Sequence, residues 1–146
     1  LRQAFPAAVS DERVQFFGED GVLYVDPVRF GAAADNLLAN ARRHADKRIR
    51  IGLEMTLRPP RLVVEDDGAG AAADELSRLG QRFFRGAGGR HEGAGLGLSI
   101  VLATIKAHGG EVRFLNSPLG GLRVELLLDR INIRSDGSGG EGRKSD

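Results

Sequence analysis

The chain has 146 residues, 41% of them apolar and 28% charged, which is the size and balance of one globular domain with a sizeable core. Its 21 Lys and Arg residues against 20 Asp and Glu leave a formal net charge of +1, which argues against nucleic acid or an acidic membrane surface as the main partner. The absence of cysteine excludes a disulfide scaffold, a cysteine-based zinc site and a thiol nucleophile, and because the chain opens with Leu1 we expect a piece of a longer protein.

The first part of the chain predicts two short strands, a long helix and a longer strand. Residues 14–17 and 23–25 are apolar runs separated by a Gly-Glu-Asp-Gly segment, which is typical of a hairpin. An Asp-Pro pair then predicts a helix over residues 26–45, with the aspartate as cap and the proline in the first turn. Residues 49–57 alternate between apolar and polar side chains, which predicts a half-buried strand.

The second part of the chain predicts three further strands and two further helices. The strands are expected at residues 62–64, 112–114 and 122–128. The helices are expected at residues 74–80 and 96–108, the second closed by two glycines. This order predicts an α/β fold: a two-layer sandwich with a mixed sheet and about three helices on one face. We expect residues 1–130 to form the domain and residues 131–146 to be a disordered tail, since their last stretch has no apolar residue.

The first helix carries a polar stripe apart from its apolar one. Asn36 and Asn40 lie four residues apart and therefore share a face, with Arg43 and His44 beside them. Amide oxygens suit Mg²⁺ or its bound water next to phosphates, and an arginine there would add a phosphate-pairing charge. The alternative interpretation is a solvated polar face without a ligand.

A carboxylate followed by Gly-x-Gly ends the strand at residues 62–64. Asp67 could accept a hydrogen bond from an amino group such as adenine N6, and Gly68 and Gly70 would let the backbone pass against a flat ring. The alternative is an acidic turn, since Asp-Gly is a common turn pair.

Glycines also gather just before the last helix. A glycine-rich segment over residues 93–99 opens the helix, where free N–H groups and the helix dipole favour an anion such as phosphate. It lacks the pattern of a P-loop, and it fits a dinucleotide-binding loop poorly. Residues 85–92 are interpreted as a mobile lid over this site. The alternative for residues 93–99 is a flexible linker before the helix, and the alternative for residues 85–92 is a disordered surface loop.

Taken in order, these segments resemble the catalytic, ATP-binding domain of sensor histidine kinases, in the GHKL superfamily with its Bergerat ATP-binding fold. The resemblance covers residues 14–129. Its motifs are DNLLANARRHA (35–45) as the N box, EDDGAG (65–70) as the G1 box, QRFFRG (81–86) as the F box, GAGLGLSIV (93–101) as the G2 box and GGLRVEL (120–126) as a weaker last glycine box.

The resemblance implies a role for each matching residue, with ATP and Mg²⁺ as cofactors. Asn40 would coordinate Mg²⁺, Asn36 would lie near the phosphates, and Arg43 and His44 would face the nucleotide. Asp67 would bind the adenine amino group, with Gly68 and Gly70 making room for the ring. The remaining ATP-binding residues would anchor the lid or wrap the triphosphate: Phe83, Phe84, Arg85, Gly93, Ala94, Gly95, Leu96, Gly97 and Leu98. The candidate catalytic residues are Asn36, Arg43 and Arg85.

Asn36 favours phosphoryl transfer over hydrolysis. The gyrase and MutL ATPases carry a glutamate at this place, which orients the attacking water, and an amide cannot accept that proton. The resemblance therefore implies transfer of the ATP γ-phosphoryl group to a histidine on a separate dimerisation domain, and later to an aspartate of a response regulator. No histidine of this chain lies in such an acceptor motif: His91-Glu92 has the dipeptide but falls in the lid. Leu122 and Ala94 depart from the family, which often has Thr or Ser there.

Two other functions are considered. One is a GHKL serine kinase of the anti-sigma type, which Asn36 does not separate from a histidine kinase. The other is a nucleotide-binding interaction module without transferase activity. We expect the domain to be cytoplasmic, with ATP and the histidine-bearing domain as partners and no nucleic acid, and the resemblance allows a parent protein held in the cell membrane as a sensor.

Overall fold

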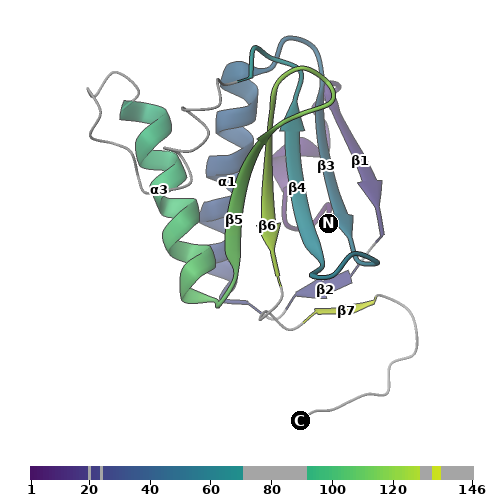
Figure 1. Cartoon of the computed structure of the whole chain (residues 1–146), viewed down its shortest axis with the longest axis vertical. Coiled ribbons are helices and arrows are strands. Elements are labelled where there is room, and N and C mark those ends of the chain that lie inside the picture. The colour runs from purple at the N-terminus through teal and green to yellow at the C-terminus, as the bar shows by residue number, and fades with distance from the viewer. Residues whose placement is uncertain (20, 24, 71–91, 129–132, 136–146) are drawn as a thin grey trace.

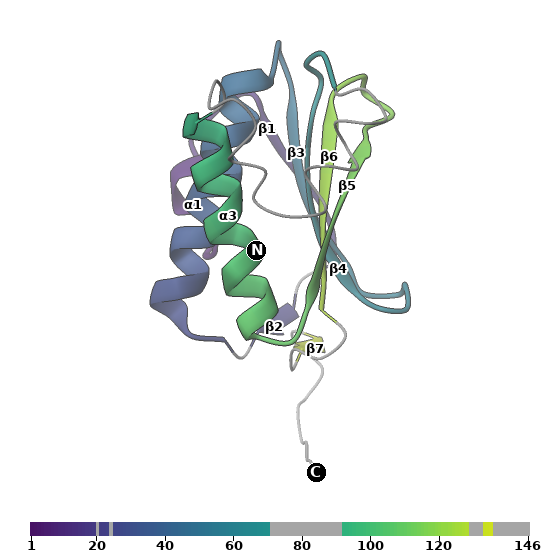
Figure 2. The same cartoon turned by 60° about the vertical axis from the view of Figure 1, so that its left-hand side comes forward.

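A five-stranded sheet covered on one face by two helices forms the fold in a computed structural model, which describes residues 1–19, 21–23, 25–70, 92–128 and 133–135. Figure 2 shows the helices as one layer and the sheet as the other, which confirms the predicted two-layer α/β class. The strand order is β1-β3-β4-β6-β5. The strands are β1 (Val14–Gly18), β3 (Ile49–Glu54), β4 (Arg61–Asp66), β5 (Glu111–Asn116) and β6 (Leu122–Leu127).

The sheet is mixed, as predicted. β1 pairs with β3 in parallel, whereas β3 with β4, β4 with β6 and β5 with β6 are antiparallel. The antiparallel pairs put the end of β4 beside the start of β6, in the register that pairs Glu65 with Arg123. Residues far apart in sequence therefore meet at one end of the sheet.

The helices α1 (Pro27–His44) and α3 (Glu92–Ala107) cover the sheet. Asp26 caps α1, accepting hydrogen bonds from the backbone N–H groups of Val28 (3.0 Å) and Arg29 (3.3 Å), as the Asp-Pro signal predicts. The core between the layers is apolar, and each large side chain buried there stabilises the fold by roughly 1.5–3 kcal/mol. The helices contribute Phe30, Ala33, Ala34, Leu37, Leu38, Ala41, Leu98, Val101 and Ile105 to it.

The predicted hairpin after β1 is wrong. β1 lies against β3, with Val14 and Phe16 packed on the core, and β2 (Gly21–Leu23) pairs with β7 (Ile133–Ser135) in a separate two-stranded sheet. The glycine-bearing segment signals a change of direction, but β1 pairs with β3, which lets the partly buried Val14 and Phe16 pack against the core. β7 also lies within the span expected to be a tail; the other residues of 131–146 fall outside the described residues.

The last helix begins earlier than predicted. α3 starts at Glu92, so the glycines expected in a loop before residue 96 lie in its first turns. The helix predicted at residues 74–80 falls outside the described residues. Among the residues that the structure describes, none of the helices combines the length and the apolar character that a membrane span requires.

Candidate functional site

Four segments meet at one end of the sandwich. The end of α1, the end of β4, the turn between β5 and β6 and the start of α3 lie together in the upper part of Figure 1. They carry the described parts of the N, G1, G2 and last glycine boxes. The fold therefore brings together the segments that the sequence analysis selected.

The polar stripe of α1 faces the start of α3. The amide nitrogen of Asn36 donates to the carbonyl oxygen of Ala32 (2.8 Å), and a Cβ placed on Gly97 would lie 2.9 Å from Asn36 Oδ1. The asparagine oxygen thus points at the first turns of α3. Arg43 and His44 follow on α1 with exposed side chains.

Asn40 is the buried polar residue of α1. Its exposed fraction is 6%, and its side-chain amide forms no hydrogen bond with the residues that the structure describes. A buried amide without a partner loses its bonds to water without compensation, so it needs a reason. A neutral amide oxygen is a ligand that Mg²⁺ accepts, so Asn40 fits a metal or its bound water.

Asp66, one residue before the predicted adenine ligand, is the buried carboxylate of the G1 box. It is 2% exposed, and its Oδ1 accepts hydrogen bonds from the N–H groups of Gly68 (2.8 Å) and Leu122 (3.3 Å). No described residue donates to its second oxygen. Burial raises the pKa of Asp66, and the two N–H donors offset this only in part.

Asp67 is turned toward the loop that follows α1. Its Oδ1 accepts from the backbone N–H groups of Asp46 and Lys47, both at 2.9 Å. Burial acts to raise the pKa of Asp67, but backbone hydrogen bonds at Arg48, Lys47 and Asp46 together outweigh it and lower the pKa. The carboxylate that the sequence analysis selected therefore holds the α1–β3 loop.

The strand pattern contains the signal that points to Asp66. Side chains alternate between the two faces of β4, so Asp66 follows Leu62 and Val64 on the face that packs against the helices. Asp67 comes after the last residue of the strand. The Gly-x-Gly spacing alone does not separate the two aspartates.

Two glycines let the G1 segment pass between its neighbours. A Cβ on Gly68 would overlap the carbonyl oxygen of His44, and a Cβ on Gly121 would overlap Asp66 and the amide nitrogen of Gly68. The segment is thus held between the end of α1 and the β5–β6 turn. These contacts require glycine independently of any ligand.

The remaining predicted residues divide into three groups. Leu98 is 5% exposed and packs in the core, whereas Gly93, Ala94, Gly95 and Leu96 lie in the first turns of α3. The F-box residues Phe83, Phe84 and Arg85 fall outside the described residues. No cluster of three or more His, Asp or Glu that could hold a metal occurs in the described part of the chain.

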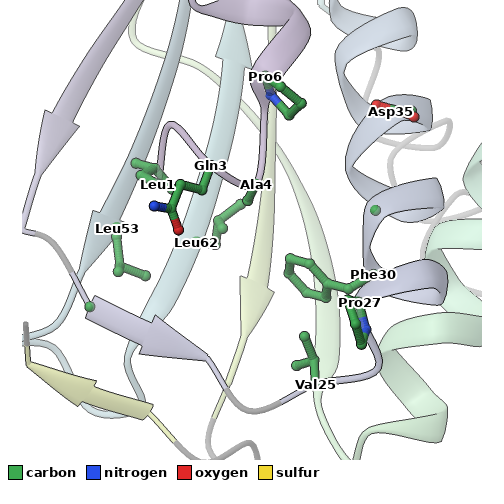
Figure 3. A pocket seen from close by; sticks show the side chains of 12 residues that line it. Leu1, Gln3, Ala4, Pro6, Val25, Pro27, Phe30, Asp35, Leu53 and Leu62 are labelled. Carbon is green, nitrogen blue, oxygen red and sulfur yellow. The ribbon is translucent and has the colours of Figure 1, made fainter.

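A cavity of about 420 Å³ lies at the opposite end of the sandwich (Figure 3). The first residues of the chain, the start of α1 and the paired residues Leu53 and Leu62 line it. Its lining includes Asp35, the first residue of the N box, but none of the residues predicted to bind ATP or Mg²⁺. The predicted ATP and Mg²⁺ ligands therefore do not line this cavity.

Comparisons with known proteins agree with the arrangement. The family model described as "Histidine kinase-, DNA gyrase B-, and HSP90-like ATPase" matches residues 25–132. The chain is 36% identical over 103 residues to the sensor-type histidine kinase PrrB of Mycobacterium leprae, covering 70% of this chain and 23% of the relative. It is 34% identical over 109 residues to the sensor histidine kinase CpxA of Escherichia coli, covering 73% and 24%. The chain thus spans about a quarter of the length of these curated relatives.

Solved structures show the same fold. The ATP-binding domain of PrrB from Mycobacterium tuberculosis matches with a TM-score of 0.65 at 26% identity, over 86% of this chain and 87% of that one. The histidine kinase domain of the E. coli osmosensor EnvZ matches with a TM-score of 0.62 at 26% identity, over 99% and 89%.

Asp66 and Asp67 are expected to change the free energy of unfolding with pH in opposite directions. With its raised pKa, Asp66 takes up a proton in the folded chain at a higher pH than in the unfolded chain. Wild-type stability relative to Asp66→Asn should therefore increase as pH falls from the raised value toward 3.8. The lowered pKa of Asp67 gives stability that is present above 3.8 and lost as pH falls through the lowered value, so Asp67→Asn should destabilise most near neutral pH.

Urea denaturation of both variants from neutral pH to about pH 3 measures these differences. Each variant is the control for the other, since the same atom is exchanged at neighbouring positions. If the stability differences between wild type and the two variants changed with pH in the same direction, the opposite pKa shifts assigned to Asp66 and Asp67 would be contradicted.

Proposed function

Because the chain belongs to the family of histidine kinase-, DNA gyrase B- and HSP90-like ATPases, we propose that it holds Mg²⁺-ATP for transfer of the γ-phosphoryl group to a histidine of a separate domain. It is the ATP-binding catalytic domain of a two-component sensor histidine kinase. The proposal includes three partners outside this chain. They are the acceptor histidine, the dimerisation domain that carries it and the response regulator that receives the phosphoryl group.

Asp66 is the observation that carries the proposal. It offers a buried carboxylate oxygen without a described partner, next to a glycine segment held between the end of α1 and the β5–β6 turn. Adenine presents an exocyclic amino group, which needs such an acceptor, and a charged acceptor gives the stronger hydrogen bond. We therefore assign to Asp66 the adenine contact that the sequence analysis expected of Asp67.

The phosphates are assigned to the facing ends of the two helices. Asn40 would hold Mg²⁺, which neutralises phosphate charge during the transfer. Asn36 and the exposed Arg43 project from α1 beside it, and the N-terminal end of α3 favours an anion. We propose that Phe83, Phe84 and Arg85 anchor the lid, as the family resemblance implies. These three residues fall outside the described residues.

The reaction follows from what these residues can do. The acceptor imidazole nitrogen attacks the γ-phosphorus, the bond to the β–γ bridging oxygen breaks, and ADP leaves with that oxygen. Asn36 has no basic group to take a proton from water, so the site favours an incoming nucleophile over hydrolysis. The domain contributes positioning and charge stabilisation, which supply most of the catalysis in phosphoryl transfer. Because the domain needs ATP, we propose that it works in the cytoplasm.

Asp66→Asn is expected to weaken ATP binding by about tenfold to a hundredfold, because the amide puts a donor or a neutral acceptor against the adenine amino group. Calorimetric titration of the folded variants with ATP measures the affinity. Asp67→Asn is the matched control and should stay within about threefold of wild type, since its carboxylate binds the α1–β3 loop. A large loss for Asp67→Asn with wild-type affinity for Asp66→Asn would reverse the assignment.

Asn40→Ala is expected to remove the strengthening of ATP binding by Mg²⁺ while leaving metal-free binding near wild type. The reason is that the amide oxygen contacts the metal and not the base. Titrations with and without Mg²⁺ measure this, and Arg29→Ala, an exposed change in the first turn of α1, is the control. A variant with the full Mg²⁺ effect would refute the metal role.

Mixing this chain with γ-labelled ATP and the histidine-bearing domain of its parent is expected to label that domain in an acid-labile form, as a phosphohistidine. The Asp66→Asn variant is the negative control. An acid-stable label would indicate the serine kinase alternative. Saturable ATP binding without any label would indicate a nucleotide-binding module.

A further inference from the structure

Glu65, the neighbour of Asp66 in sequence, is fully buried on the face of the sheet opposite the helices. Its side chain is 0% exposed and pairs with Arg50 Nη1 at 3.0 Å and with Arg123 Nη1 at 3.2 Å. Both arginines are its cross-strand neighbours, on β3 and β6. Arg50 also stacks on the ring of Phe17, 4.1 Å from its centroid. The carboxylate of Glu65 is thus buried, although it lies on the face of the sheet that the helices do not cover.

Glu65 is also bonded to the turn between β5 and β6. The hydroxyl of Ser117 donates to Glu65 Oε1 (2.9 Å) and accepts from the N–H of Leu119 (2.9 Å). The N–H of Ser117 in turn donates to the carbonyl oxygen of Gly121 (2.6 Å). Glu65 Oε1 therefore holds Ser117, the first residue of the turn, and Ser117 in turn holds Gly121, the last residue of the turn.

The same turn contacts Asp66 from the other face of the sheet. Gly121 lies directly against Asp66, and the N–H of Leu122 donates to Asp66 Oδ1. Since side chains alternate along a strand, Glu65 and Asp66 reach opposite faces and hold the two sides of one turn. A displacement of the turn would move the donor that orients Asp66.

The enclosure of Glu65 needs a reason beyond stability. Replacing a buried ion pair by apolar residues is often neutral or stabilising, so such a pair is weak evidence for a contribution to stability. Directional bonds between fixed partners give position instead. We propose that Glu65 and Ser117 are positioning residues, which hold the β5–β6 turn against Asp66 and so set the carboxylate for the amino group of adenine; this rests on the proposed role of Asp66.

Ser117→Ala in the full chain tests the proposal, because it removes the link between Glu65 and the turn and leaves both ion pairs of Glu65 intact. Dissociation constants for ATP and for inosine triphosphate, which has a carbonyl oxygen in place of the 6-amino group, are measured together. We expect the preference for ATP to fall by about fivefold or more, and Glu65→Gln to act in the same direction.

Glu125→Gln is the matched control. Glu125 is also a buried glutamate of the outer face, paired with Arg61 (3.3 Å) and Arg123 (2.8 Å). Within the described part of the chain, its side chain makes no bond to the turn. Its variant should lose stability in urea denaturation and keep the wild-type ratio of the two dissociation constants. That ratio separates positioning from a general loss of packing.

Two results would overturn the proposal. An unchanged ratio in Ser117→Ala, with Asp66→Asn losing the preference for ATP, refutes the role of Glu65 and Ser117 and leaves the adenine contact standing. A wild-type chain that binds ATP and inosine triphosphate equally well refutes the adenine contact itself, and the positioning role with it.

Discussion

Close backbone packing around Gly68 is the constraint on which the candidate site depends. The carbonyl oxygen of His44 lies on one side of this segment and Gly121 on the other, with no space for a Cβ at either glycine. The end of α1, the end of β4 and the β5–β6 turn are therefore fixed relative to one another by close contacts that leave no room for a further side chain. Because these close contacts fix the three segments, the surface that would bind a nucleotide here is preorganised.

Asp66 and Glu65 show two ways of burying a carboxylate at neighbouring positions. Glu65 is compensated by two arginines and a hydroxyl, so its charge is neutralised within the protein. Asp66 receives two backbone N–H groups on one oxygen, and burial keeps its pKa raised. The incomplete compensation of Asp66 is the property expected of a group that completes its hydrogen bonds with a ligand.

Local signals in the sequence predicted the α/β class and the capping of α1 by Asp26, and the family resemblance implied that the glycine boxes meet. They did not predict the partner of β1, because the choice between a hairpin and pairing with β3 depends on burial across the whole sheet. The helical state of residues 92–95 was also missed, since glycines weaken the helix signal. The Gly-x-Gly spacing predicts Asp67 as the adenine ligand, whereas the alternation of side chains along β4 puts Asp66 on the face toward the helices.

The bond between Asp66 and Leu122 joins residues 56 positions apart, and that between Glu65 and Ser117 joins residues 52 apart. Contacts of this sequence separation close late, after most chain entropy has been lost, and they slow folding. A partly folded chain without these contacts would lack the proposed site, so ATP would bind only the native state. By mass action the nucleotide then stabilises the folded domain, so the cellular ATP pool would protect this domain from unfolding as well as supply its substrate.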